Sequence, residues 1–290
     1  MSLNPQILRD ESVKRWLDGV TPVWTLLEKN SFETLLRPPH PTRGPIRLNY
    51  ELSLEDIESS PVAHNTLILL RAASAAPGLK MTATGNLSRN VVEEMRDCFQ
   101  WPGFGNVETY PFHRVINEPD FFPLFFVRHV AQSAQLLHKQ KKLLKVTPAG
   151  RKVISQSHTP ALQAILFHIT MWHLDLNHLG RGLYPDWPHA TGVVLWSMST
   201  AAIEWQSAES LTRLCAIPIH EVLKEQRDMA SYAMEARILR PLLWFGLLDH
   251  KEDDIPAAKF GKKNFYRKTE LFDRFLSFDI KIGGSGELRH

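Results

Sequence analysis

Three histidines at equal spacing are the first residues to consider for chemistry. His168, His173 and His178 are each five residues apart in an apolar stretch. Since a helix turns about 100° per residue, successive histidines would point about 140° apart and could not share one face as metal ligands. His168 and Asp175 would lie on one side and could hydrogen-bond to a common partner. The spacing favours buried, hydrogen-bonded histidines or contact residues, and it predicts no metal site.

A second candidate is the run Asp249, His250 and Lys251, which resembles the Asp-x-Lys end of a restriction-type nuclease site. Such a site also needs an acidic residue on a neighbouring strand of a mixed sheet, and Asp186 lies far away among expected loops. The chain has no glycine-rich nucleotide loop, no His-Glu-x-x-His motif and no Gly-x-Ser-x-Gly motif. We therefore expect no enzymatic activity, no catalytic residue, no metal and no cofactor.

Two basic segments could bind an anionic partner. Neither contains Asp or Glu, and the second is interleaved with Phe260, Phe265 and Tyr266. Flexible basic hairpins of this kind can bind phosphates and lie in a minor groove. Solvated surface turns are the alternative, because lysine is common in exposed hairpins. The basic residues are Lys139, Lys141, Lys142, Lys145, Arg151 and Lys152 in the first segment, and Lys259, Lys262, Lys263, Arg267 and Lys268 in the second.

A repeated order of elements surrounds these segments. Residues 121–154 are predicted to form a helix, a Leu-Leu pair, a hairpin turning at 140–142, and a new helix after the cap Thr147. The same order returns over residues 236–278 with a longer hairpin, and we expect a closing helix over 270–278. Each copy is preceded by two more helices. The repeat predicts two domains of one architecture.

The helix before each hairpin is mainly apolar. In the first copy the spacing places Val127, Val130 and Ala131 on one face and Arg128 elsewhere. A helix that reads bases in the major groove usually presents several Arg, Lys, Asn or Gln side chains, and these helices present few. The pattern favours phosphate contacts by the hairpins, with Arg128 and Arg237 nearer the grooves.

Caps and helix breakers predict the remaining elements. A helical leader is expected over residues 1–60, and Asn65 is expected to cap the next helix. A short strand is predicted over 79–82. Pro241 should kink the long helix predicted over 219–243.

The two copies, FFVRHVAQSAQLL with LLKVT and YAMEARILRPLLWFGLL with FYRKT, resemble a tandem pair of winged-helix domains. The chain also resembles uncharacterised bacterial plasmid- and phage-associated winged-helix-like proteins. The resemblance implies a mainly α fold with short β-hairpins. It further implies an N-terminal helical leader at 1–60, winged-helix-like domains at 61–157 and 158–282, and a flexible tail at 283–290.

The resemblance implies that the partner is double-stranded DNA and that the two basic wings contact it. The alternative is a protein-interaction or scaffold module, since tandem winged helices also serve as docking and dimerisation units. In that case the apolar side at 121–126 would face a protein partner or a second copy.

The composition excludes several other classes. The chain has 290 residues, of which 43% are hydrophobic, and a formal net charge of +3, too small to indicate nucleic acid by itself. Cys98 and Cys215 form no Cys-x-x-Cys pair, so neither a disulfide framework nor a zinc ribbon is predicted. No signal-peptide pattern or membrane-spanning stretch is found. We expect a cytoplasmic protein that does not contact a membrane.

Overall fold

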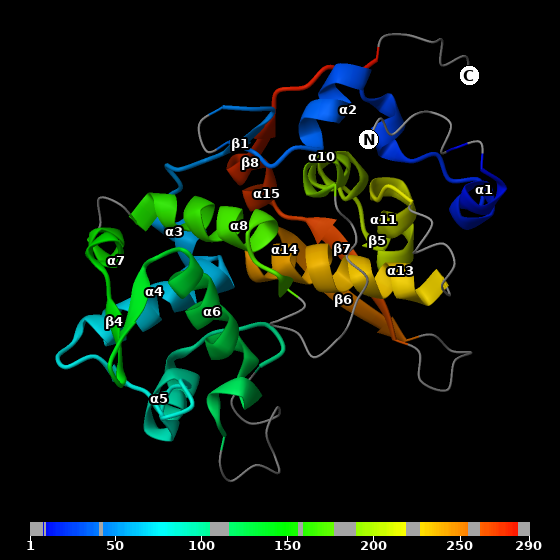
Figure 1. Ribbon diagram of the computed structural model, residues 1–290. Helices are drawn as coiled ribbons and strands as arrows, with labels where there is room; N and C mark the ends of the chain where they lie inside the picture. Colours follow the sequence, from blue (N-terminus) through cyan, green and yellow to red (C-terminus); the bar gives the residue numbers. More distant parts are fainter. Residues whose placement is uncertain are drawn as a thin grey trace. The chain divides into compact units, whose positions relative to one another are not determined.

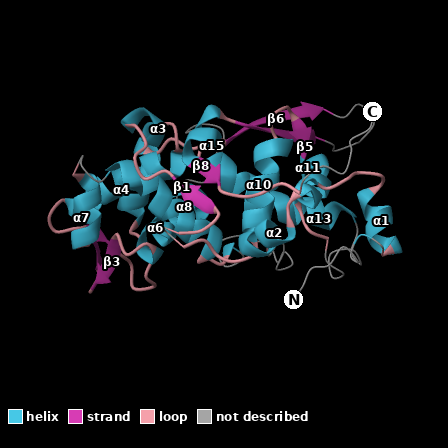
Figure 2. Ribbon diagram, turned by 90° about the horizontal axis from the view of Figure 1, so that it is seen from above, coloured by secondary structure: helices cyan, strands magenta, loops and turns pink. Residues whose placement is uncertain are grey.

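The structure is a computed structural model that describes residues 8, 10–40, 43–104, 116–155, 159–176, 190–218, 227–254 and 262–283. Helices make up most of these residues, and the strands form small antiparallel sheets (Figures 1 and 2). The prediction of a mainly α architecture with short hairpins is thus confirmed.

The described chain divides into two compact units. Unit 1 takes its residues from Met1–Leu48, Gly182–Leu243 and Leu247–His290, and unit 2 from Asn49–Arg181 and Trp244–Gly246. The domain boundaries expected at residues 60, 157 and 282 stay a prediction.

Unit 2 is a helical body with a three-stranded antiparallel sheet in the order β2-β4-β3. Leu124, Phe126 and Phe167 are fully buried at its core. Its helices are α3 (Leu54–Glu58), α4 (Pro61–Ser74), α5 (Arg89–Cys98), α6 (Phe122–Ser133), α7 (Pro148–Ile154) and α8 (Leu162–Trp172). Its strands are β2 (Leu79–Lys80), β3 (Leu137–Gln140) and β4 (Leu143–Val146), and 3-10 turns lie at η3 (Glu118–Asp120) and η4 (Thr159–Ala161).

Local signals explain where these helices begin. The Thr147 hydroxyl accepts a hydrogen bond from the Gly150 N–H at 3.0 Å, so the predicted cap of α7 is confirmed. The predicted start of α4 at Asn65 is wrong, because Ser60 caps that helix and Pro61 follows it. Asn65 instead lies buried inside α4, where its side-chain nitrogen donates to the Gln100 carbonyl at 2.6 Å.

Unit 1 has a two-stranded sheet, β1-β8, and a three-stranded antiparallel sheet in the order β5-β7-β6. Its helices are α1 (Glu11–Leu17), α2 (Lys29–Leu35), α10 (Thr191–Ala201), α11 (Ala208–Cys215), α13 (Arg227–Met234), α14 (Arg240–Trp244, whose last residue belongs to unit 2) and α15 (Glu270–Phe275). Its strands are β1 (Ile46–Leu48), β5 (Gln206–Ser207), β6 (Leu248–Asp254), β7 (Lys262–Lys268) and β8 (Leu276–Phe278), and a 3-10 turn, η2, covers Val23–Leu26.

The N-terminal segment packs inside unit 1. Trp24 Nε1 donates to the Ala216 carbonyl at 3.2 Å. A Cβ on Gly192 would lie 2.4 Å from the Leu35 carbonyl oxygen, so α2 and α10 approach each other closely. Strand β1 pairs with β8, and the closing helix expected over 270–278 therefore ends at Phe275.

The long helix before the second hairpin changes its winding just before Pro241. A π turn, η5 (Glu235–Leu239), separates α13 from α14, and the Arg240 N–H donates to the Glu235 carbonyl. Proline has no N–H for the carbonyl four residues earlier, that of Arg237, and its ring crowds that carbonyl. The kink predicted at Pro241 therefore takes the form of the π turn η5, which directly precedes Arg240 and Pro241.

The two units repeat one order of elements: helix, strand, helix, helix, hairpin, helix. In unit 2 these are α4, β2, α5, α6, β3–β4 and α7, and in unit 1 they are α10, β5, α11, α13–α14, β6–β7 and α15. Both three-stranded sheets place the first strand beside the last strand of the hairpin.

The same backbone hydrogen bonds close both copies. The Leu136 N–H donates to the Ala131 carbonyl, and the Leu247 N–H to the Leu242 carbonyl, each at 2.9 Å. The repeat predicted from sequence is therefore present in the topology.

Candidate nucleic-acid interface

The β3–β4 hairpin presents a dense group of positive charge. Lys141 and Lys142 form its tip, between the paired residues Gln140 and Leu143. Lys141 has a φ of 56°, as the first residue of a tight two-residue hairpin turn can require. The turn predicted at 140–142 is present as Lys141 and Lys142 alone, because Gln140 is the last residue of β3.

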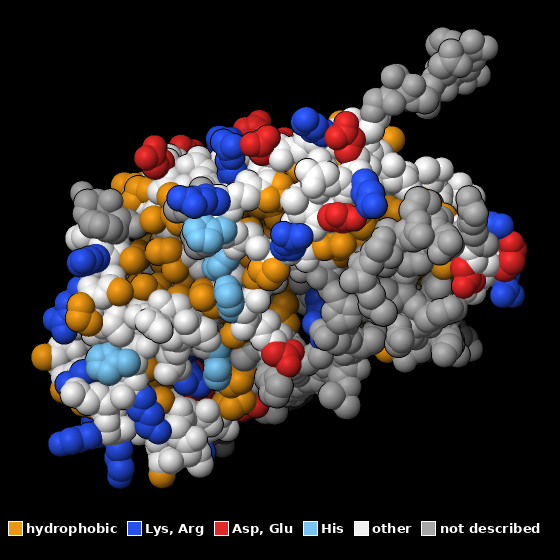
Figure 3. Space-filling view, turned by 45° about the horizontal axis from the view of Figure 1, so that its top comes forward, with side chains coloured by type: hydrophobic (Ala, Val, Ile, Leu, Met, Phe, Trp, Pro, Cys, Tyr) orange, Lys and Arg blue, Asp and Glu red, His pale blue; other side chains and the backbone are white. Residues whose placement is uncertain are grey.

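Five lysines surround this hairpin. Lys139, Lys141 and Lys142 are exposed and Lys145 is half-buried. Lys80 lies outside both predicted basic segments and is exposed on β2 opposite Leu143. Within the described part of the chain, none of these ammonium groups has a carboxylate within ion-pair distance. Lys and Arg side chains project on the left of Figure 3, the side on which Figure 1 draws this hairpin.

The β6–β7 hairpin has a different charge balance. Its strands contain five basic side chains and also four acidic ones, whereas the first hairpin has four basic side chains and no acidic one. The acidic residues all lie on β6, opposite the basic strand, and only the pairing of the two strands brings them beside the predicted basic segment. They are Asp249, Glu252, Asp253 and Asp254.

Basic residues of this second hairpin contact groups of their own unit. Arg267 Nη2 lies 3.1 Å from Asp249 Oδ2, and Lys268 Nζ lies 2.8 Å from Asp273. The guanidinium of Arg267 also lies over the Trp205 ring at 4.8 Å, and Lys251 Nζ lies over the same ring at 5.1 Å. These cations are therefore less available to a phosphate than those of the first hairpin.

The remaining predicted basic residues fall in several environments. Arg151 and Lys152 are exposed on α7. Lys262 lies on β7 opposite Asp254, and Lys263 is exposed opposite Asp253. Lys259 lies outside the described residues.

Arg128 does not point away from the core, and that expectation is wrong. Its side chain is 7% exposed and donates to Glu118, whose side chain is fully buried. Arg128 Nη1 also donates to Gln132 Oε1 at 2.8 Å. Helical periodicity could not show this, because the partner Glu118 comes from the turn η3. Arg237 is half-buried in η5, with its Nε and Nη2 atoms enclosed.

Helix α6 therefore offers little to a nucleic-acid groove. Its positions from Phe122 to Ser133 are mostly buried apolar residues, and Ser133 is exposed at the end. His129 is half-buried, with its Nδ1 atom 2.7 Å from the Phe125 carbonyl oxygen. Burial lowers the pKa of His129, which disfavours a positive charge on this side chain.

A buried carboxylate lies under the second hairpin. Glu235 in η5 accepts hydrogen bonds from Asn264 Nδ2 at 2.8 Å and from the Tyr266 hydroxyl at 3.3 Å. Burial and the nearby Glu235 raise the pKa of Tyr266. This network satisfies a buried charge and ties the π turn to β7.

Two of the histidines meet, contrary to the sequence expectation. His168 Nε2 and His173 Nε2 lie 3.0 Å apart. Helix α8 ends at Trp172, so the angle per residue of a helix no longer applies to His173 or Asp175. Among the described residues, no three His, Cys, Asp or Glu side chains come together as metal ligands would. His178 lies outside them.

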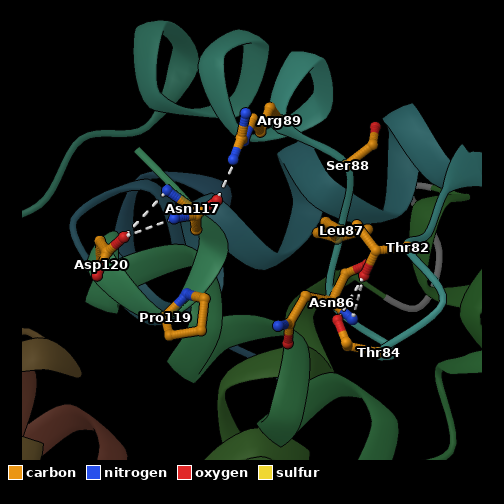
Figure 4. A pocket seen from close by; sticks show the side chains of 9 residues that line it. All are labelled: Thr82, Thr84, Asn86, Leu87, Ser88, Arg89, Asn117, Pro119 and Asp120. Carbon is orange, nitrogen blue, oxygen red and sulfur yellow. Dashed lines mark hydrogen bonds between the residues drawn. The ribbon is translucent and has the colours of Figure 1, made fainter. Parts of the chain in front are cut away.

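A polar pocket lies beside the first hairpin, between residues 82–89 and residues 117–120 (Figure 4). Arg89 Nε donates to Asn117 Oδ1 across it at 3.2 Å.

Within the described residues, no helix is long and apolar enough to cross a bilayer.

Comparison with known proteins finds similarity in one copy of the repeat. A family model described as the Y4jL N-terminal domain matches residues 58–159, which contain α4 to α7. The uncharacterized protein y4jL of Sinorhizobium fredii (strain NBRC 101917 / NGR234) is 32% identical over 92 residues. This match covers 32% of the present chain and 42% of that protein, so the chain spans less than half of this relative. No solved structure matches the chain.

Proposed function

We propose that the protein binds double-stranded DNA without catalysing a reaction, and that each unit contains one winged-helix domain. The order helix, strand, helix, helix, hairpin in both units supports the fold assignment. The sheet orders β2-β4-β3 and β5-β7-β6 support it further, because the first strand joins the hairpin at the same edge in both. In this assignment the β3–β4 and β6–β7 hairpins are the wings.

The observation that carries the DNA proposal is the charge of the β3–β4 hairpin. Lys139, Lys141, Lys142 and Lys145 lie on ten residues with no carboxylate, and Lys80 adds a fifth ammonium group from β2. A lysine without an intramolecular partner can neutralise a phosphate and release its condensed counterions. The first hairpin is therefore the main contact, and the second hairpin contributes less.

Binding of this kind is independent of base sequence. The long side chains that read base edges are Arg, Lys, Asn and Gln. On α6 the candidates are Arg128, which is buried and paired with Glu118, and Gln132, which accepts from Arg128. Contacts to phosphates position a protein on DNA but do not select a sequence.

The apolar start of α6 does not favour the alternative, a protein-docking module. Phe121, Leu124 and Phe126 are buried within unit 2, and Phe126 packs against Trp101 and Trp244. These side chains contribute to the core of unit 2 and are not exposed to a partner.

The proposal is tested by fluorescence anisotropy of labelled 20-base-pair duplexes between about 30 and 300 mM salt. Log affinity should fall linearly with log salt, by about 0.9 per phosphate contact. Two unrelated sequences should bind with affinities within about threefold of each other. A flat salt dependence, or no binding at the lowest salt, would contradict the proposal.

A further inference from the structure

The pocket beside the first hairpin has a volume of about 570 Å³ and a polar lining. One wall is the turn after β2 and the start of α5, and the other is the segment that leads into α6 (Figure 4). Such a volume accommodates a phosphate group with part of the molecule that carries it. The lining residues are Thr82, Thr84, Asn86, Leu87, Ser88, Arg89, Asn117, Pro119 and Asp120.

The lining offers hydrogen-bond donors that the fold does not use. Arg89 is exposed and donates through Nε to Asn117, and its two terminal nitrogens have no partner among the described residues. Ser88 precedes α5, yet its hydroxyl makes no capping hydrogen bond. A guanidinium with free donors beside hydroxyl groups is suited to an oxyanion.

The one carboxylate in the lining is already engaged. Asp120 Oδ2 accepts from the Asn117 N–H at 3.1 Å and from Asn117 Nδ2 at 3.2 Å. These bonds fix the turn η3, and Asn117 lies between this carboxylate and Arg89 (Figure 4). The negative charge of Asp120 therefore weakens anion binding in the pocket, but its hydrogen bonds go to Asn117 and leave the Arg89 and Ser88 donors unused.

The pocket adjoins the basic hairpin. Lys139 Nζ lies 3.6 Å from the position that a Cβ on Gly85 would occupy, so this ammonium group reaches the turn that forms one wall. Leu137 and Lys139 lie on β3, and Lys139 is paired in the ladder with Leu144 of β4. A chain of phosphates that follows the hairpin tip would therefore pass the mouth of the pocket at Lys139.

We propose that this pocket binds a phosphate group, held by Arg89 and Ser88, with Lys139 at its rim. The phosphate is a backbone phosphate of the duplex that the hairpin contacts, and this part rests on the proposed function. A small phosphomonoester offers the same chemistry, so the experiment separates the two sources.

The first arm uses inorganic phosphate and amide NMR spectra of the full chain. Signals of residues 82–89 and 117–120 should shift saturably at millimolar phosphate. Arg89→Gln should abolish the saturation, whereas Arg96→Gln should leave it unchanged, because Arg96 lies on the same helix and pairs with Asp97. Asp120→Asn should tighten binding several-fold by removing a negative charge. Unshifted pocket signals, or equal shifts in the Arg89→Gln variant, would overturn the proposal even if duplex DNA binds.

The second arm measures duplex affinity against salt for the same variants. Arg89→Gln should weaken binding about 3- to 10-fold and reduce the salt slope by about 0.9, one phosphate contact. If phosphate fills the pocket but Arg89→Gln leaves duplex binding unchanged, the backbone assignment is wrong and the source is a small phosphorylated ligand. If no duplex binds at all, the proposed function fails, and the phosphate arm alone decides the pocket.

Discussion

A single carboxylate, that of Glu118, joins three segments of unit 2. One of its oxygens accepts from Arg128 of α6, and the other accepts from the Leu87 N–H at 2.6 Å. Glu118 itself belongs to η3, which forms part of the pocket wall. Burial raises the pKa of Glu118, while Arg128 and the Leu87 N–H act in the opposite direction. The pair therefore holds α6 to the segments that line the pocket.

Arg128→Met should destabilise the protein by about 3 to 5 kcal/mol at pH 7.5, because it leaves a buried carboxylate without its cation. Losing Arg128 raises the pKa of Glu118 further. A folded-state pKa above the unfolded value adds stability at low pH that is lost as pH rises through the folded pKa. The loss caused by Arg128→Met should thus be smaller at pH 4.5 than at pH 7.5, as measured by urea unfolding at both pH values.

Arg96→Met is the matched control on the neighbouring helix. Arg96 pairs with Asp97 at the surface, where an ion pair contributes about 0 to 1 kcal/mol. An equal loss in both variants, or a loss for Arg128→Met that does not depend on pH, would contradict this role of the pair.

At the scale of the element, the ends of the two third helices differ at the position with the left-handed backbone conformation. Gln135 has a φ of 56° after α6, and Gly246 has a φ of 71° at the same place after α14. Glycine adopts this left-handed conformation freely, whereas a residue with a Cβ is strained in it.

Gln135→Gly should therefore raise the free energy of unfolding by about 0.5 to 1 kcal/mol, since relief of strain exceeds the added freedom of the unfolded chain. Urea unfolding measures this change. Gly246→Ala is the opposite test, because its new Cβ would lie 2.8 Å from the Ser59 carbonyl oxygen. A stabilised Gly246→Ala variant, or a destabilised Gln135→Gly variant, would show that the two helix ends are not equivalent.

Sequence reasoning succeeded for elements with local signals and failed where distant segments meet. The cap Thr147 and the hairpin tip at 140–142 follow from neighbouring residues and were predicted. Strands β1 and β8 have three residues each, too few to show an alternation, and their pairing joins the two ends of unit 1. Arg128 was misplaced for the same reason, because its partner comes from η3 outside the helix.

At the scale of the whole molecule, residues 10–48 are part of unit 1 and support its C-terminal portion. Ile46 of β1 is 3% exposed, while its neighbour Arg47 points outward and pairs with Asp279 at the surface. Because neighbouring side chains of β1 alternate between buried and exposed, Ile46 and Arg47 offer a matched pair of substitutions.

Ile46→Gln should destabilise unit 1 by about 3 kcal/mol or more, because it removes a buried aliphatic side chain and buries an amide. Arg47→Gln should cost less than about 1 kcal/mol. Hydrogen exchange of residues 276–278 and 191–201 measures the effect locally. Equal exchange in the two variants would mean that β1 adds nothing to unit 1.

The two hairpins differ in charge, so they should not contribute equally to DNA binding. The hairpin that contains Lys141 and Lys142 has no carboxylate. The hairpin that contains Lys251 and Lys263 also contains the acidic residues of β6. Each pair is exposed and can be changed to glutamine without disturbing the core.

The most direct test is the salt dependence of duplex affinity for Lys141→Gln/Lys142→Gln beside Lys251→Gln/Lys263→Gln. The first variant should lose about 1.8 in the slope of log affinity against log salt, equal to two phosphate contacts. The second should change the slope by less than about half that amount. An unchanged slope for the first variant, or an equal loss for both, would contradict the assignment of the phosphate contacts to the β3–β4 hairpin.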